Sequence, residues 1–205
     1  MTDAPMPYAR STISQCCNAF ARAAKTVASH ELKRAAVAIT LVDDGTAFLL
    51  TLRATSLRGH SGQWALPGGR CDAGETAIDG ALRELHEELG LRCDAADVLG
   101  LLDDYPTRSG YLITPVVVWA GVEANLVPNP DEVASVHRIG LDAIAADDAF
   151  DFITIPESDR RVIRYRHGDS HIHAPTAALI YQFREMLAGR TTPVADLEQP
   201  VFAWR

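Results

Sequence analysis

The sequence predicts an α/β or α+β fold, a single domain in which a few helices pack on a β-sheet. Short apolar, β-branched runs alternate with a small number of helical patterns, and no internal repeat or low-complexity linker interrupts them. The 205 residues are enough for one well-buried core and too few for two average domains with linkers. With 47% hydrophobic and 22% charged residues, the composition is that of a folded globular protein.

Apolar runs bounded by turn residues predict the strands. Residues 35–42 and 48–52 flank the turn sequence Asp43-Asp44-Gly45-Thr46, which predicts a β-hairpin at the start of the sheet. Further candidate strands are residues 98–102, 111–120, 133–139 and 150–155. Pro115 lies within one of these candidates and has no backbone N–H, so it implies a sheet edge, a bulge or a strand start.

Two helical patterns lie near the ends of the chain. The Ala-rich residues 14–29 predict a peripheral N-terminal helix, and residues 176–187 carry apolar side chains at helical spacing. We therefore divide the chain into an N-terminal helical segment (1–30), a main domain (31–190) and a C-terminal tail (191–205).

The charge balance narrows the function. Nineteen Lys and Arg residues face 27 Asp and Glu residues, a net charge of −8, which disfavours binding to nucleic acid. No apolar run reaches the ~20 residues of a membrane helix, and the first residues lack a signal-peptide pattern. We expect a cytoplasmic protein that binds neither nucleic acid nor membrane.

The strongest helical pattern covers residues 77–89. Thr76 and Asp79 have the spacing of a capping box, and Gly90 marks a Schellman-like end. At about 100° per residue, the apolar side chains of this helix form one stripe along its length.

Three glutamates of this helix, Glu84, Glu87 and Glu88, share an arc beside the apolar stripe. Like charges at this spacing repel by a few tenths of a kcal/mol per pair, and a divalent cation would reverse the sign. Carboxylate oxygens without a His or Cys ligand select Mg²⁺ or Mn²⁺. The alternative is a solvated acidic helix face.

The segment from Gly69 to Leu91 resembles the Nudix box, G-x5-E-x7-R-E-U-x-E-E-x-G-U, in which U is aliphatic. All nine specified positions are filled, by Gly69, Glu75, Arg83, Glu84, Leu85, Glu87, Glu88, Gly90 and Leu91. The resemblance implies an α/β/α sandwich around a mixed β-sheet and Mg²⁺-dependent hydrolysis of a nucleoside diphosphate linked to another moiety, X. It also implies that Glu84, Glu87 and Glu88 bind the metal and that Arg83 orients Glu75.

Hydrolysis of a diphosphate requires neutralised oxygens and an activated water, and bound metal ions supply both without a covalent intermediate. The water also needs a base. Glu87, Glu88 and Glu132, which lies outside the box, are the candidates. The alternative for Glu132 is a place on a surface loop.

The residues before the box resemble the signature of coenzyme A pyrophosphatases. The similar segments are residues 49–53, 57–63 and 66–69, with Leu66 in place of the usual Phe. This similarity implies hydrolysis of coenzyme A or acyl-coenzyme A to 3′,5′-ADP and 4′-phosphopantetheine or its acyl form.

Several residues in and near this signature are candidates for binding the substrate: Arg53, Arg58, His60, Gly68, Gly69 and Arg70. Cationic side chains here could hold the phosphates of a nucleotide, although solvated surface cations and a loop hydrogen bond are the alternatives. Other functions stay open, namely hydrolysis of ADP-ribose, a dinucleotide or a nucleotide triphosphate, and a non-enzymatic ligand sensor. We expect a small-molecule nucleotide as partner and leave a homodimer open.

Overall fold

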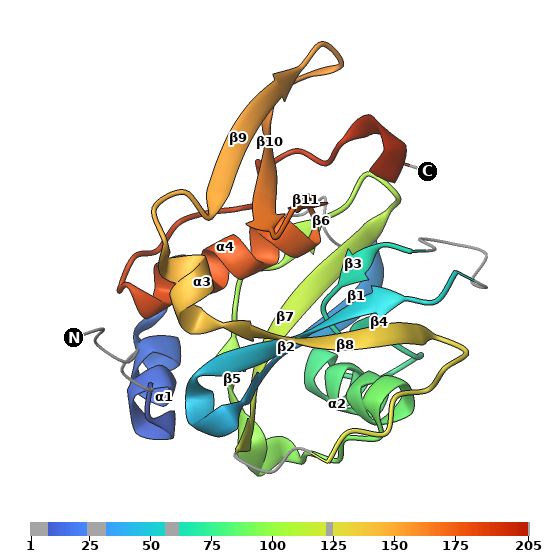
Figure 1. The fold of residues 1–205 in the computed structure, drawn as a ribbon, viewed down its shortest axis with the longest axis vertical. Helices are drawn as coiled ribbons and strands as arrows, with labels where there is room; N and C mark the ends of the chain where they lie inside the picture. Colours follow the sequence, from blue (N-terminus) through green and yellow to red (C-terminus); the bar gives the residue numbers. More distant parts are fainter. Residues whose placement is uncertain (1–7, 24–31, 56–61, 122–124, 205) are drawn as a thin grey trace.

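A computed structural model describes residues 8–23, 32–55, 62–121 and 125–204. Its main sheet has eight strands, with β1 (Lys33–Val42) and β7 (Tyr111–Gly121) running parallel through its centre (Figure 1). The far edge of β7 pairs with β5 (Val98–Leu101) and β6 (Tyr105–Pro106).

The other edge of β1 is divided between two strands. Its C-terminal end pairs with β2 (Ala47–Arg53), which forms the predicted hairpin, and its N-terminal half pairs with β4 (Gly68–Arg70). β2 also pairs with β3 (Trp64–Ala65) and with β8 (Val133–Gly140). The chain between β3 and β4 therefore crosses from β2 to β1 and carries the glycine loop into the sheet.

Helices cover both faces of this sheet (Figure 1). α2 (Ala77–Leu89) packs on one face, where its Leu85 and Leu89 join Ala36 of β1 in a buried cluster. The second cluster, on the opposite face, takes side chains from α1 (Arg10–Ala19), α3 (Leu141–Ala145) and α4 (Thr176–Leu187). The α/β/α sandwich around a mixed sheet is thus confirmed. Short 3-10 turns occur at Asp43–Gly45, Ala95–Asp97 and Val201–Ala203.

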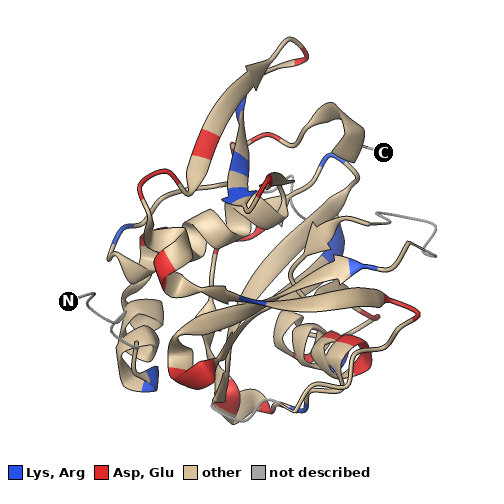
Figure 2. Ribbon diagram, viewed as in Figure 1, with Lys and Arg blue, Asp and Glu red and all other residues tan. Residues whose placement is uncertain are grey.

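A second, three-stranded sheet projects from the body (Figure 1): β9 (Phe150–Ile155), β10 (Ser158–His167) and β11 (Ser170–His173). The sequence predicted β9 but not β10, whose arginines obscure its pattern. Val162 and Ile163 of β10 are buried, while Arg164 forms an ion pair with Asp151 of β9 at 2.7 Å. Figure 2 shows the basic residues of β10 on this projecting sheet.

Pro115 lies inside β7, beside an interruption in the pairing with its neighbouring strands. Of the three possibilities for this proline, a sheet edge, a bulge or a strand start, the structure has the bulge. β5 and β6 both pair with β7, but residues 102–104 between them leave the regular ladder beside Pro115. The Pro115 carbonyl accepts a hydrogen bond from the Leu102 N–H at 3.0 Å. No ladder bond is lost there, because the missing N–H faces the interruption.

The predicted N-terminal helix over residues 14–29 is wrong in its bounds. α1 begins at Arg10 and ends at Ala19, and residues 24–31 lie outside the described residues. After Ala19 the backbone extends, because the Ala23 N–H donates to the Asp103 carboxylate at 2.7 Å. This hydrogen bond across the fold replaces further helical bonds. The helix is also less peripheral than expected, since Ile13 is fully buried.

The C-terminal residues lie against the body and do not extend as a tail. Val194 is buried, and the Glu198 side chain, 2% exposed, forms an ion pair with Arg108. The Ser158 hydroxyl donates to the same carboxylate at 2.7 Å. Mainly through the Arg108 hydrogen bonds, the pKa of Glu198 falls from 4.5 to about 2.

We expect Arg108→Ala to lower the free energy of unfolding at pH 7 by about 2 kcal/mol, because it strands the buried Glu198 carboxylate. A lowered folded-state pKa stabilises the fold fully above pH 4.5, and this contribution is lost as the pH falls toward 2. The difference from the unmodified protein should therefore shrink in acid. Urea unfolding at pH 7 and pH 3 measures it, with the exposed Arg92→Ala as control. An equal difference at both pH values would contradict this account.

Candidate active site

Helix α2 has the predicted bounds, and its ends explain why. The Thr76 hydroxyl accepts the Asp79 N–H at 3.2 Å, and the Asp79 carboxylate accepts the Thr76 N–H at 3.3 Å. At the other end Gly90 is left-handed, with φ of 66°, and its N–H donates to the His86 carbonyl. The helix therefore presents the residues of the box in a fixed register.

Arg83 organises the outer part of the site. Its guanidinium donates two hydrogen bonds to Glu75, at 2.9 and 3.1 Å. It also donates to Glu84 at 2.9 Å, to Glu87 at 2.8 Å and to the Arg70 carbonyl at 3.0 Å. Chiefly through the Arg83 hydrogen bonds, the pKa of Glu75 is lowered and that of Arg83 is raised. The predicted pairing of Arg83 with Glu75 is present in the structure.

Glu88 occupies the inner part of the site and is only 3% exposed. It accepts the Gly68 N–H at 3.1 Å and lies 3.5 Å from the Arg53 guanidinium. Burial raises the pKa of Glu88 to about 7. Burial likewise raises the pKa of Glu84, whose side chain is 14% exposed. Both carboxylates therefore lie where a positive charge would be favourable.

Two glycines let the loop approach the sheet and the helix. Gly68 has a φ of +150°, and a Cβ there would clash with the Ala36 carbonyl oxygen and come within 2.6 Å of the Val37 Cα. A Cβ on Gly69 would come within 2.5 Å of the Glu84 carboxylate. Larger residues would displace the loop that binds Glu88, so the glycines serve the geometry of the site.

Glu132 approaches the helix glutamates from a different segment. The loop that carries it is tied to the C-terminal end of α2, because the Asn129 N–H donates to the Glu88 carbonyl at 2.8 Å. The Asn129 side chain donates to the Glu132 carboxylate at 3.3 Å. The charge of Glu132 contributes to the raised pKa values of Glu84 and Glu88. Glu132 thus lies on a loop, as the alternative had it, and this loop places it beside the helix glutamates.

A cavity of about 370 Å³ lies between the sheet and the C-terminal part of the chain. Its lining includes these predicted site residues: Arg53, Gly68, Gly69, Arg70, Glu84, Glu88 and Glu132. Glu75 and Glu87 are not part of this lining, and Glu87 is 50% exposed beside Arg83. Two candidates for binding the substrate, Arg58 and His60, lie outside the described residues.

The donor set suits a hard cation. Glu84, Glu88 and Glu132 offer only carboxylate oxygens, and the buried Glu88 would gain most from a neighbouring cation. Within the described ranges, however, no three His, Cys, Asp or Glu side chains already converge on one point. The Arg83 guanidinium already donates hydrogen bonds to the carboxylates of Glu84 and Glu87. The residues therefore fit Mg²⁺ or Mn²⁺ in chemistry, with side-chain adjustment on binding.

Several cavity residues were absent from the sequence-based candidates: Trp64, Tyr111, Thr176 and Gln199. They come from segments far apart in the chain, and no local motif marks them. Only the fold brings them together.

A glutamate-rich helix joined to a glycine loop, inside an α/β/α sandwich, is the arrangement of a hydrolase that acts on diphosphates. The chain belongs to the Nudix family, since it matches the NUDIX domain over residues 32–165. It is 33% identical, over 165 residues, to the uncharacterized Nudix hydrolase NudL of Pectobacterium atrosepticum, covering 78% of this chain and 86% of the relative. The chain is an enzyme, a Nudix hydrolase of diphosphate bonds.

Two further comparisons concern the sequence and the fold. Nudix hydrolase 3 of Caenorhabditis elegans is 38% identical over 112 residues, which span 53% of this chain and 47% of that protein. The solved Deinococcus radiodurans protein DR0079 has a TM-score of 0.51 at 16% identity, covering 73% of this chain and 82% of its own, and shows likeness of fold alone. Among the described residues, no helix is both long and apolar enough to cross a membrane.

Proposed function

We propose that this enzyme hydrolyses the diphosphate bond of coenzyme A or acyl-coenzyme A, releasing 3′,5′-ADP and 4′-phosphopantetheine or its acyl form. The supporting observation is where the residues before the box lie. Arg53, Gln63 and Leu66 line the same cavity as Glu84 and Glu88. The described residues of the segments that resemble the coenzyme A pyrophosphatase signature therefore adjoin the helix glutamates.

In this proposal Glu84, Glu88 and Glu132 face the bound diphosphate, and Mg²⁺ or Mn²⁺ is the cofactor. When bound, such a cation neutralises phosphate oxygens and lowers the pKa of water. Arg83 keeps Glu75, Glu84 and Glu87 in place through its hydrogen bonds. We assign proton abstraction from the attacking water to Glu132, because its carboxylate lines the cavity, whereas we assign Glu88 to the cation and Glu87 accepts a hydrogen bond from Arg83.

A substrate panel in ¹⁸O-labelled water tests the function. We expect coenzyme A to have the highest kcat/KM among coenzyme A, ADP-ribose, a dinucleotide and ATP, with products identified by mass. The label should appear in one product phosphate after a single turnover, because water attacks phosphorus directly. Much faster cleavage of ADP-ribose or a dinucleotide would refute the substrate, and label in a protein carboxylate would refute direct attack.

Arg53→Ala is expected to slow hydrolysis of coenzyme A, dephospho-coenzyme A and ADP-ribose alike, by about tenfold each, the loss of one charge-assisted contact. Arg53 lies 3.5 Å from Glu88, and its Nε is buried without a hydrogen-bond partner among the described residues. At this position Arg53 would contact the diphosphate, which all three substrates share. Comparison of kcat/KM for the three substrates measures it. A loss confined to coenzyme A would instead place Arg53 at the 3′-phosphate.

A further inference from the structure

The C-terminal part of the chain forms one wall of the active-site cavity. Pro175, Thr176 and Leu179 of the α4 region line it together with Gln199 and Ala203. We call these five residues the C-terminal wall. All five lie beyond residue 165, where the match to the NUDIX domain ends. Figure 1 shows α4 and the C-terminal turn on the opposite side of the main sheet from α2.

The wall is fixed to the neighbouring loop by several contacts. The Arg108 N–H donates to the Gln199 side-chain oxygen at 2.7 Å, and the Arg108 guanidinium pairs with Glu198. The Trp204 indole N–H donates to the Gln199 carbonyl at 2.8 Å. The Thr176 hydroxyl donates to the Trp64 carbonyl at 3.2 Å. These bonds hold the wall in a defined position before any substrate enters.

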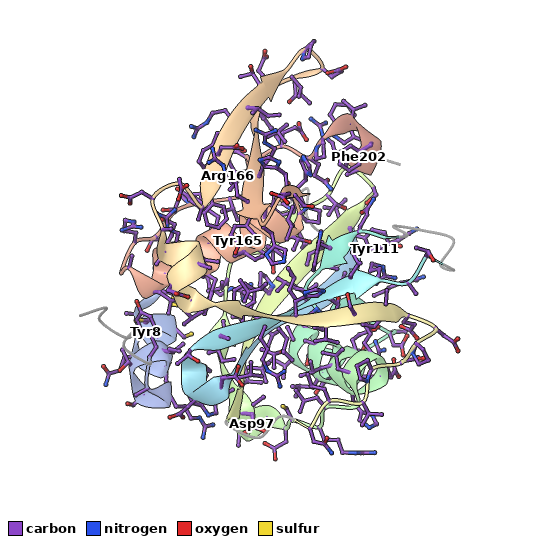
Figure 3. The ribbon with its side chains drawn as sticks, viewed as in Figure 1. Tyr8, Asp97, Tyr111, Tyr165, Arg166 and Phe202 are labelled. Atoms are coloured by element: carbon purple, nitrogen blue, oxygen red, sulfur yellow. The ribbon has the colours of Figure 1, made fainter. Side chains whose placement is uncertain are left out.

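The chemistry of this side of the cavity differs from that of the glutamate side. None of the five wall residues carries a charge, and Trp64, Tyr111 and Ile113 add apolar surface to the same cavity. The charged lining residues among those described, such as Glu84, Glu88 and Arg53, belong to the catalytic side. Figure 3 shows Tyr111 at the start of β7, below the C-terminal turn that carries Phe202.

Gln199 adds one directed polar group. The side chain is buried, and its oxygen already accepts the Arg108 N–H. The amide is thereby oriented, and its nitrogen makes no hydrogen bond to any residue within the described ranges. This NH₂ group can donate to a carbonyl or hydroxyl oxygen of a ligand.

We propose that the C-terminal wall binds the X moiety of the nucleoside diphosphate-X substrate, and that it selects an uncharged, partly apolar chain bearing carbonyl oxygens. An uncharged lining that is partly apolar, with one oriented amide donor, favours such a group over a second charged nucleotide. The inference rests on the proposed function, because it takes the diphosphate to lie at the glutamates. An amide-containing arm such as that of coenzyme A has this chemistry.

The test compares two substrates that differ only in X: coenzyme A and the β-methyl ester of 3′-phospho-ADP, whose X is a single carbon. Ala203→Leu places a larger side chain at the wall and so fills part of the cavity. We expect the ratio of kcat/KM for coenzyme A to that for the methyl ester to fall tenfold or more. Gln199→Glu keeps an oxygen for the Arg108 N–H but removes the NH₂ donor, and the ratio should fall about fivefold. Val201→Leu, on the same turn but 40% exposed, is the matched control and should leave the ratio unchanged.

Thermal unfolding of each variant separates loss of fold from loss of selectivity, and Gln199→Glu decides alone if Ala203→Leu does not fold. An unchanged ratio in the folded variants would overturn the role of the wall. If the unmodified enzyme does not hydrolyse coenzyme A, the proposed function fails. The same ratio, taken with the best ADP-X substrate of the panel, then still tests the wall.

Discussion

Glu88→Gln should lower kcat/KM by about 100- to 1,000-fold while the protein remains folded. Glutamine keeps the size of the side chain and an oxygen that can accept the Gly68 N–H, which lies 3.1 Å from the carboxylate. It removes the negative charge from the most buried of the three helix glutamates. Loss of that charge weakens cation binding at the diphosphate, so the effect falls on catalysis.

The stability of the metal-free protein should not fall with its activity in this variant. Burial raises the pKa of Glu88 from 4.5 to about 7, so the metal-free fold loses stability as the pH rises between these values. Glutamine has no charge to bury. In EDTA at pH 8 we therefore expect Glu88→Gln to unfold at a temperature no lower than that of the unmodified protein.

Steady-state kinetics at saturating Mg²⁺ and a thermal melt measure the two effects. Glu157→Gln, at an exposed position, makes the same change of net charge and serves as the control. Near-normal turnover by Glu88→Gln would remove Glu88 from the proposed cation site. A large loss of stability would mean that the charge supports the fold.

The catalytic helix could be predicted from the sequence because its determinants are local. Thr76, Asp79 and Gly90 set its ends through bonds within a few residues, and the structure has the same bounds. The pairing of Arg83 with Glu75 spans only eight residues. Sequence spacing is a good guide to geometry where the chain stays within one helix and the turn before it.

The rest of the site depends on contacts between distant segments. Gln199 is oriented by Arg108, 91 residues earlier in the chain, and no local pattern distinguishes it from a surface glutamine. The strand β10 was not predicted, because its arginines interrupt the buried residues Val162 and Tyr165. Pairing with β9 makes this segment a strand. Contacts between distant segments determine both the orientation of Gln199 and the strand β10. Such a contact also ends α1 earlier than the sequence predicts.

Arg83→Lys is expected to lower kcat/KM by about 100-fold, through the positions of the carboxylates that Arg83 holds. The guanidinium makes five hydrogen bonds of 2.8 to 3.1 Å, two of them to Glu75. Lysine keeps the charge but has three donors on a single nitrogen, so it cannot bridge the same partners. Chemical unfolding should show a smaller loss, about 1 kcal/mol, because the side chain is partly exposed.

A double-mutant cycle with Glu75→Gln separates positioning from direct action. If Arg83 acts by fixing Glu75, each single variant already breaks the same unit, and the double variant should be little slower than the worse single one. The measured quantity is the coupling in kcat/KM, with the melting temperature of each variant recorded beside it. Losses that simply multiply would show that Arg83 and Glu75 act independently, and Arg83 would then act through Glu84 or Glu87 and not through Glu75.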